Sequence, residues 1–126
     1  MLVLSTLPHY VAIAYSENTG YTITILVSST LSVVWHALGE PYGIWMYLDY
    51  FAALCWFLYE LYLGKNKITI LLLNGVVFTL NRLIPQEHYI VYHSIWHLIS
   101  SMKSIYISKQ LQLNLRDANI QSFHQA

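Results

Sequence analysis

Charged side chains are scarce in this sequence. Lys, Arg, Asp and Glu make up 10% of its 126 residues, with six basic residues balancing six acidic ones. An average soluble protein has about 25% charged residues, so this chain carries too few to cover a soluble globule of its size. The zero net charge also excludes the basic surface typical of nucleic-acid binding.

Cysteine is almost absent as well. The single residue, Cys55, excludes an internal disulfide, and its place in an apolar run is typical of a thiol that packs as a small hydrophobe. No basic segment precedes the first apolar stretch, which disfavours a cleaved signal peptide. We therefore expect residues 2–16 to form a short or tilted first helix.

Apolar residues, in contrast, are abundant. They make up 56% of the chain, and 11 Tyr and 4 Trp add side chains that favour membrane interfaces. Roughly 18 helical residues at 1.5 Å each extend about 27 Å, close to the thickness of a bilayer core. The sequence predicts an all-α, polytopic bundle of about five transmembrane helices over residues 1–107, followed by a polar C-terminal tail at 108–126. Short polar turns separate the five predicted helices, at residues 2–16, 21–38, 44–63, 68–84 and 88–107.

The positions of Lys and Arg predict an orientation for this bundle. Lys65 and Lys67 lie between the third and fourth predicted helices, and Lys109 and Arg116 lie beyond the fifth. If successive helices alternate in direction, these two places are on one side of the membrane and only Arg82 is on the other. Because cytosolic loops are enriched in Lys and Arg, we expect a multi-pass protein with its C-terminus in the cytosol.

Polar residues inside the predicted helices converge near the opposite, non-cytosolic face. His36 ends the second helix, Asp49 follows the start of the third, and His93 and His97 lie on one face of the last helix. Three neutral imidazoles with an open fourth position are typical of a catalytic zinc site. There Asp49 could orient or deprotonate water, and Ser32, one turn before His36, could donate a hydrogen bond to the developing oxyanion.

The other polar residues in these helices have simpler interpretations. We expect Glu60, near the cytosolic face, to meet Lys65 or Lys67 in the headgroup region. Asn74 and Asn81 are expected to form hydrogen bonds between helices. His9 has no paired histidine nearby in the sequence and is interpreted as incidental.

The order of the site residues resembles a known family. Ser-x-x-x-His (Ser32 to His36), then Asp49, then His-x-x-x-His (His93 to His97) is similar to the pattern of the CREST superfamily. That superfamily includes the alkaline ceramidases, the progestin/adiponectin receptors and a branch with myomaker and post-GPI-attachment lipases. The local sequences STLSVVWHAL, YLDYF and HSIWH look most like the last branch.

The resemblance covers about residues 28–52 and 88–105. It implies a seven-helix fold, zinc held by the three histidines, and hydrolysis of a lipid amide or ester in the active members. Between the aspartate and the histidine pair, however, this chain has room for one helix where the family has three. The resemblance therefore implies a reduced version of the seven-helix fold.

These observations leave more than one function open. The histidines favour a zinc-dependent intramembrane hydrolase with a membrane lipid as its substrate. The missing helices favour a non-catalytic membrane subunit or pseudoenzyme, in which a homo- or hetero-oligomer supplies the absent part of the wall. Haem ligation is a third interpretation, but two axial histidines from different helices would leave one histidine unused.

Overall fold

The chain is helical throughout the part that the computed structural model describes, which is residues 2–125, with side chains described for residues 2–121. No strand occurs in this part, so the predicted all-α fold is confirmed. The second, third and fourth helices lie close to their predicted positions. The five α-helices are α1 (Leu2–Thr6), α2 (Thr19–Ala37), α3 (Ile44–Leu63), α4 (Lys67–Arg82) and α5 (Tyr89–Gln125). Two 3₁₀ helices accompany them, η1 (Leu7–Tyr15) and η2 (Gln86–His88).

Polar turns set where α2 and α4 begin. The side chain of Asn18 accepts a hydrogen bond from the Tyr21 N–H at 2.9 Å, and that of Asn66 accepts one from the Thr69 N–H at 3.1 Å. Each asparagine is an N-cap that satisfies a backbone donor left free in the first helical turn. The polar breaks expected from the sequence therefore start the helices that follow them.

The first segment differs from the single helix expected over residues 2–16. α1 stops at Thr6, and the chain continues as the nine-residue 3₁₀ helix η1, with Pro8 in its first turn. Proline has no N–H to donate and its ring crowds the preceding turn, which accounts for the change of helix type at this point. His9 and Ala12 are the buried residues of η1. The whole segment packs between α2 and α5, with one face buried against them and the other exposed, as at Leu4 and Val11.

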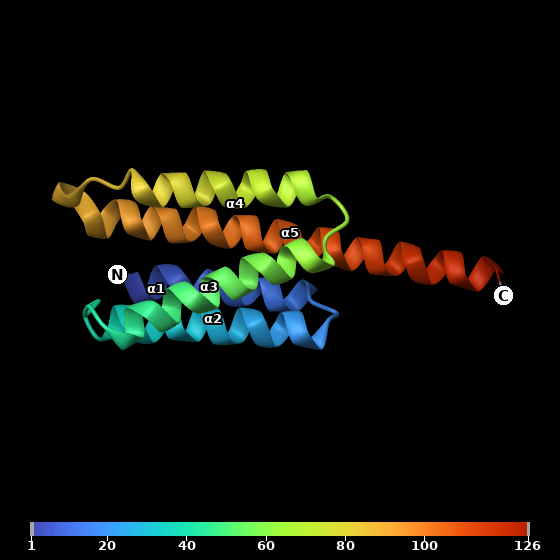
Figure 1. Ribbon diagram of the computed structural model, residues 1–126, viewed down its shortest axis with the longest axis horizontal. Helices are drawn as coiled ribbons and strands as arrows, with labels where there is room; N and C mark the ends of the chain where they lie inside the picture. Colours follow the sequence, from blue (N-terminus) through green and yellow to red (C-terminus); the bar gives the residue numbers. More distant parts are fainter. Residues whose placement is uncertain (1, 126) are drawn as a thin grey trace.

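The last helix is longer than expected. α5 does not end near Ile107 but continues to Gln125, and its far end projects beyond the rest of the bundle (Figure 1). Ile107 and Leu111 are buried in the apolar core, so packing supports the helix past its predicted end. Farther along, the Arg116 guanidinium and the Gln112 amide donate hydrogen bonds to the Glu17 carboxylate.

Two groups of helices face each other across the N-terminal segment. In Figure 1, α4 lies beside α5, while α2 and α3 form the opposite side. The apolar core occupies the half of the bundle nearest the turn that joins α3 to α4. It consists of Ala12, Tyr21, Ile25, Trp56, Ile70, Ile107 and Leu111.

A buried ion pair lies beside this core. The Glu60 carboxylate is fully buried and accepts hydrogen bonds from the Tyr21 hydroxyl at 3.1 Å and the Asn74 amide at 3.0 Å. The Lys103 ammonium lies 3.3 Å from the same carboxylate and donates to the Asn74 carbonyl oxygen at 3.0 Å. It also lies 5.5 Å from the centre of the Trp56 ring. These contacts join α2, α3, α4 and α5, and they confirm the interhelical hydrogen bond expected of Asn74.

The expected partner of Glu60 is therefore wrong. Glu60 lies on the inner face of α3, where Lys103 reaches it from α5. Lys65 is exposed, and the Lys67 ammonium donates instead to the backbone carbonyls of Leu61 and Tyr62 at the end of α3. A fully buried carboxylate requires a partner inside the bundle, and these two lysines lie outside it.

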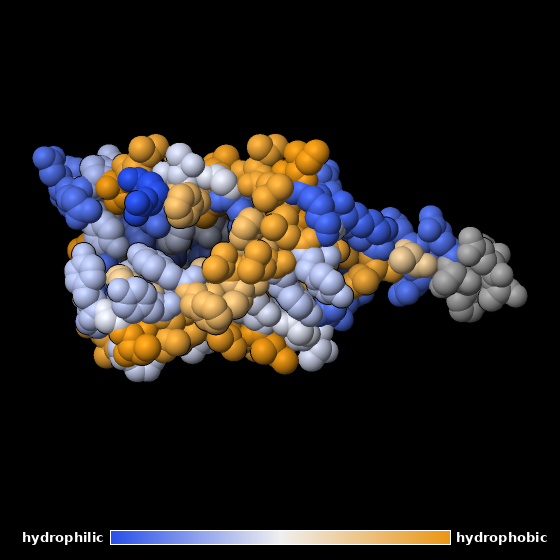
Figure 2. Space-filling view, in the orientation of Figure 1, coloured by the Kyte–Doolittle hydropathy of each residue, from blue (hydrophilic) through white to orange (hydrophobic). Residues whose placement is uncertain are grey.

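Large apolar side chains cover much of the outer surface (Figure 2). Exposed residues of this kind occur on all of α2, α3, α4 and α5, for example Ile23, Phe51, Phe78 and Met102. Within the described residues, no helix taken alone is both long and apolar enough to cross a bilayer. α4 and the stretch Gln86–Gln121 meet that requirement only as a pair, with a 92° bend at the break between them.

We predict that the Glu60–Lys103 pair governs the stability of the bundle. The change Lys103→Met should lower the free energy of unfolding by about 3–5 kcal/mol, because it leaves a buried carboxylate without its counter-charge. Adding Glu60→Gln should restore most of the loss, since it removes the unpaired charge while its one carbonyl oxygen can still accept from Tyr21. Unfolding followed by circular dichroism measures both changes.

The exposed Glu17–Arg116 pair, 3.3 Å apart, is the matched control. Removing its charges should change the free energy of unfolding by less than about 1 kcal/mol. If Lys103→Met cost no more than this control, the buried pair would not have the role assigned to it.

Candidate metal centre

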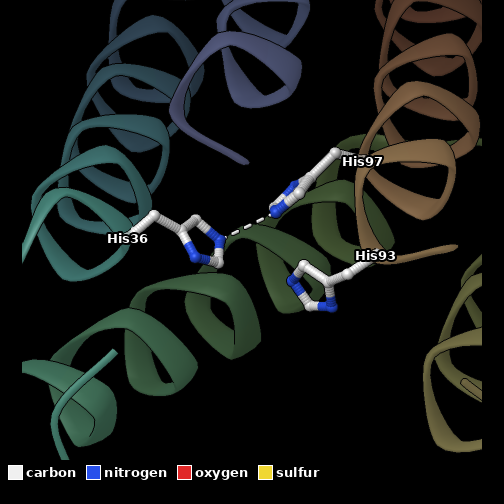
Figure 3. A group of neighbouring side chains, drawn as sticks. All are labelled: His36, His93 and His97. Carbon is white, nitrogen blue, oxygen red and sulfur yellow. Dashed lines mark hydrogen bonds between the residues drawn. The ribbon is translucent and has the colours of Figure 1, made fainter. Parts of the chain in front are cut away.

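Three histidines from two helices meet inside the bundle. His36 comes from the last turn of α2, and His93 and His97 come from successive turns of α5. Figure 3 shows the three rings pointing toward one another across the gap between these helices. One nitrogen of each ring lies within 4.8 Å of the other two, and the ring centres are 4.7–5.3 Å apart. The predicted convergence of the three histidines is confirmed.

Tryptophans enclose this cluster on both helices. The Trp35 ring lies 5.1 Å from the His36 ring, and the Trp96 ring lies 5.1 Å from His93 and 4.9 Å from His97. The Trp96 indole N–H donates to the carbonyl of Val77 at 2.7 Å, which ties α5 to α4 at the site. All three histidines are buried, at 8%, 5% and 3% exposure for His36, His93 and His97. The cluster is thus largely shielded from solvent.

Hydrogen bonds satisfy only part of the cluster. The Nε2 atoms of His36 and His97 are 2.8 Å apart, and the His36 Nδ1 lies 2.8 Å from the Glu40 carboxylate. Both nitrogens of His93 and the Nδ1 of His97 are buried without a hydrogen-bond partner among the described residues. A buried polar atom left unpaired costs about 1–3 kcal/mol. A metal ion held between the rings would relieve that cost, so the residues present fit a metal.

The spacing of the nitrogens suits a first-row metal. Metal–nitrogen bonds of about 2.0–2.1 Å in tetrahedral geometry place two ligand nitrogens about 3.3 Å apart. The closest pair here is 2.8 Å apart, and one atom from each ring lies within a 4.8 Å group. Small rotations of the rings would therefore bring all three nitrogens to bonding distance. Imidazole is a good ligand for zinc, copper, iron and nickel alike, so the geometry supports a metal ion without identifying it.

The two predicted catalytic residues, Ser32 on α2 and Asp49 on α3, lie beside each other. Asp49 is buried, and the Ser32 hydroxyl is the polar group next to its carboxylate. Neither belongs to the group of ligand atoms, which within the described residues consists of the three histidines. The roles assigned to Asp49 and Ser32 remain predictions.

Two residues next to the site were missed by sequence reasoning. His9, on η1, has its ring centre 5.9 Å from that of His97. Its Nδ1 donates to the Thr6 carbonyl at 3.0 Å, so its Nε2 accepts from the Ser100 hydroxyl at 3.2 Å. His9 thereby anchors the N-terminal segment to α5 next to His97 of the cluster. An isolated histidine in a short apolar segment gave no signal of this contact.

Glu40 is the second missed residue. It lies in the short polar turn between the predicted helices at 21–38 and 44–63, to which no role was assigned, yet its carboxylate is hydrogen-bonded to the His36 ring. The spacing of four residues from His36 was a signal in principle. It was hidden because Gly39 separates the two, and a glycine at that point indicates that the helix has already ended.

Comparisons of the chain with protein-family models, with curated proteins and with solved structures find no match. Function must therefore be inferred from the residues themselves. Those residues provide three buried nitrogen donors around one point, together with the Asp49 carboxylate on α3 and the Ser32 hydroxyl next to it on α2.

We predict that His93 binds a metal and does not stabilise the metal-free fold. In the presence of a chelator, His93→Leu should be as stable as the wild type or more stable, because it removes two unpaired buried nitrogens. Free zinc at about 100 times its Kd should stabilise the wild type by about 2.7 kcal/mol and the variant far less. Unfolding measured with zinc and with chelator separates the two effects.

His88→Leu is the matched control, because His88 is an exposed histidine of η2 outside the cluster. That variant should keep the full stabilisation by zinc. Equal stabilisation of the wild type and His93→Leu would contradict the assignment of His93 as a ligand.

Proposed function

We propose that this chain is a zinc-dependent intramembrane hydrolase that cleaves a lipid amide or ester, with His36, His93 and His97 as the zinc ligands. The observation that supports this most strongly is the burial of three imidazoles that face one another with nitrogens left unpaired (Figure 3). Catalytic zinc sites have three protein ligands and one open position, whereas structural sites have four protein ligands. Three histidines with no fourth protein ligand in the group favour the catalytic type.

Zinc, when bound, supplies activated water at neutral pH. Asp49 orients that water and accepts its proton, then returns the proton to the leaving amine or alcohol. Ser32 donates a hydrogen bond to the substrate carbonyl oxygen as negative charge develops on it. The adjacency of Ser32 and Asp49 supports this division of roles, because both side chains can then act on the same carbonyl group.

A membrane setting and a lipid substrate are supported by the surface. Charged residues make up 10% of the chain, and large apolar side chains are exposed around the bundle, including Phe51 and Phe78 at 66% each. Exposed apolar area of this extent is typical of a surface that contacts lipid or another protein. Figure 2 also shows a hollow between α5 and α3, toward the end of the bundle where α2 ends, through which an acyl chain could approach.

The order of the site residues supports membership of the CREST superfamily as a reduced form. In such a reduced form, α2 and α3 correspond to the family's Ser-x-x-x-His and Asp helices, and α5 corresponds to its His-x-x-x-His helix. Between α3 and α5 this chain has only α4, where the family has three helices. The chain lacks two of the family's helices between α3 and α5. Because two is an even number, successive helices still alternate in direction, and the three histidines can lie near the same face of the membrane.

One observation favours a second function, that of a non-catalytic membrane subunit. α4 packs on α3 and α5 and exposes several large apolar residues, including Ile68, Leu72 and Phe78. In such a subunit a metal would fasten α2 to α5, and a homo- or hetero-oligomer would cover α4. Zinc binding without hydrolysis would favour this function over the first.

We predict that zinc binding and hydrolysis can be separated by mutation. The purified wild type should contain about one zinc per chain, and His97→Ala should lose it. Asp49→Asn should keep the zinc but lower the turnover of a ceramide-like amide or a phospholipid ester by about 10²–10⁴-fold, because it removes a general base. Elemental analysis and a lipid hydrolysis assay on the same preparations measure the two properties.

A wild type expressed with zinc but purified metal-free would contradict the proposed function. Full hydrolysis by Asp49→Asn would contradict the role of that carboxylate while leaving the metal site intact. Glu17→Gln is the control, since Glu17 is an acidic residue near the opposite end of α2 and should retain both zinc and activity.

The membrane setting has its own test. Expressed in cells, the chain should stay in the membrane fraction after washing with alkaline carbonate, because its exposed apolar side chains would remain in lipid. A tag at the C-terminus should be cut by a protease added to the cytosolic side. Release of the chain into the wash would contradict the membrane setting, and protection of the tag would contradict the orientation.

A further inference from the structure

We infer that Glu40 is a positioning residue of the metal centre, which holds the His36 ring with Nε2 facing the two histidines of α5. This inference rests on the proposed function, since it assumes that the cluster binds zinc. It assigns a role to a residue outside the predicted ligand set and outside the predicted catalytic pair.

The contact itself fixes the state of the His36 ring. The Glu40 Oε1 lies 2.8 Å from the His36 Nδ1, and the two side chains are 20% and 1% exposed. An ionised carboxylate only accepts hydrogen bonds, so Nδ1 carries the proton and Nε2 of the neutral ring carries the lone pair. That Nε2 is the atom 2.8 Å from the His97 Nε2. A histidine ligand whose second nitrogen donates to a carboxylate is the usual arrangement around protein-bound metals.

The end of α2 is folded so that Glu40 returns to His36. The Gly39 N–H donates to the His36 carbonyl at 3.2 Å, and the Glu40 N–H donates to the Trp35 carbonyl at 3.0 Å. These two bonds form a Schellman motif, with Gly39 in the left-handed conformation at φ 80°. The Trp35 indole N–H also donates to the Pro41 carbonyl at 3.2 Å and fixes the chain just after the turn. The turn therefore reverses the chain within four residues of the ligand.

The backbone of Glu40 adds an independent observation. Glu40 has φ 58° and is the one residue other than glycine with a positive φ in the described part of the chain. The left-handed region is unfavourable for a side chain such as glutamate, and residues held there cluster at functional sites. Glycine or asparagine would adopt this conformation more readily. The hydrogen bond from the His36 ring to the carboxylate explains why glutamate, and not glycine or asparagine, occupies this position.

Glu40 also reaches the other half of the site. The Tyr89 hydroxyl, from the first turn of α5, lies near the Glu40 carboxylate. The Tyr89 ring packs against the His93 ring in a tilted arrangement, with ring centres 4.8 Å apart and planes inclined by 31°. The Glu40 carboxylate thus bonds a ligand of α2 directly and lies near Tyr89, whose ring packs on a ligand of α5.

Three substitutions at Glu40 separate positioning from folding. Glu40→Ala removes the acceptor, Glu40→Gln keeps an acceptor without the charge, and Glu40→Gly removes the side chain while suiting the left-handed backbone. Zinc affinity is measured on the full chain by competition with a chelator. We expect Glu40→Ala and Glu40→Gly to bind zinc about 10–100-fold more weakly than the wild type, with Glu40→Gln between them and the wild type.

A second readout reports on the His36 ring directly. In the metal-free wild type, ¹⁵N NMR of the histidine side chains should show His36 protonated at Nδ1. In Glu40→Ala that preference should be lost, while circular dichroism shows unchanged helix content. Glu40→Gly should keep the helix content and cooperative unfolding of the metal-free wild type, so that its weaker zinc binding cannot be explained by loss of the fold.

The outcomes distinguish this inference from the proposed function. Weaker zinc binding and a changed His36 proton position in the Glu40 variants, with no change in a Glu17→Ala control, would support it. Wild-type zinc affinity in Glu40→Ala would overturn it and leave the zinc hydrolase proposal standing. A wild type that binds no zinc would overturn the proposed function itself.

Discussion

A polar side chain buried among apolar helices needs a partner, because it has lost its hydration and gains nothing in return unless it is paired. α5 carries a row of such side chains on the face it turns into the bundle, and the other elements are arranged around that row. Ser100 meets His9 of η1, and Lys103 meets Glu60 of α3. Over the part of α5 whose side chains the structure describes, residues 89–121, the buried polar residues are His93, Ser94, His97, Ser100, Ser101, Ser104 and Ser108.

Two polar centres along α5 differ in one respect that decides their roles. Around Glu60 and Lys103 the charged groups are paired within the protein, so this centre needs no ligand and its role is to join the helices. Around the histidines, nitrogens of His93 and His97 are buried and unpaired. The second centre is therefore incomplete without a ligand, and imidazole nitrogens at this spacing suit a metal ion. We therefore assign stabilisation of the fold to the Glu60–Lys103 centre and metal binding to the histidine cluster.

Much of the site could be predicted because it depends on few facts. Once the helices and their turns were placed, alternation alone brought His36 to the same end of the bundle as the histidine pair of α5. Contacts that depend on side-chain direction were not predictable in this way. Glu60 pairs with Lys103, which is 43 residues away, rather than with the nearby lysines of the turn. Glu40 was missed because a left-handed turn, which no periodicity reveals, returns it to the site.

The central claim is that three histidines bind one metal ion, and X-ray absorption at the zinc edge of the purified chain tests it most directly. The spectrum should fit nitrogen or oxygen neighbours at about 2.0–2.1 Å, with the outer-shell scattering of three imidazole rings. Loss of one ring's scattering in a variant of His36 would identify α2 as a source of ligands. A zinc spectrum with sulfur neighbours, or with fewer than three imidazole rings, would contradict the account.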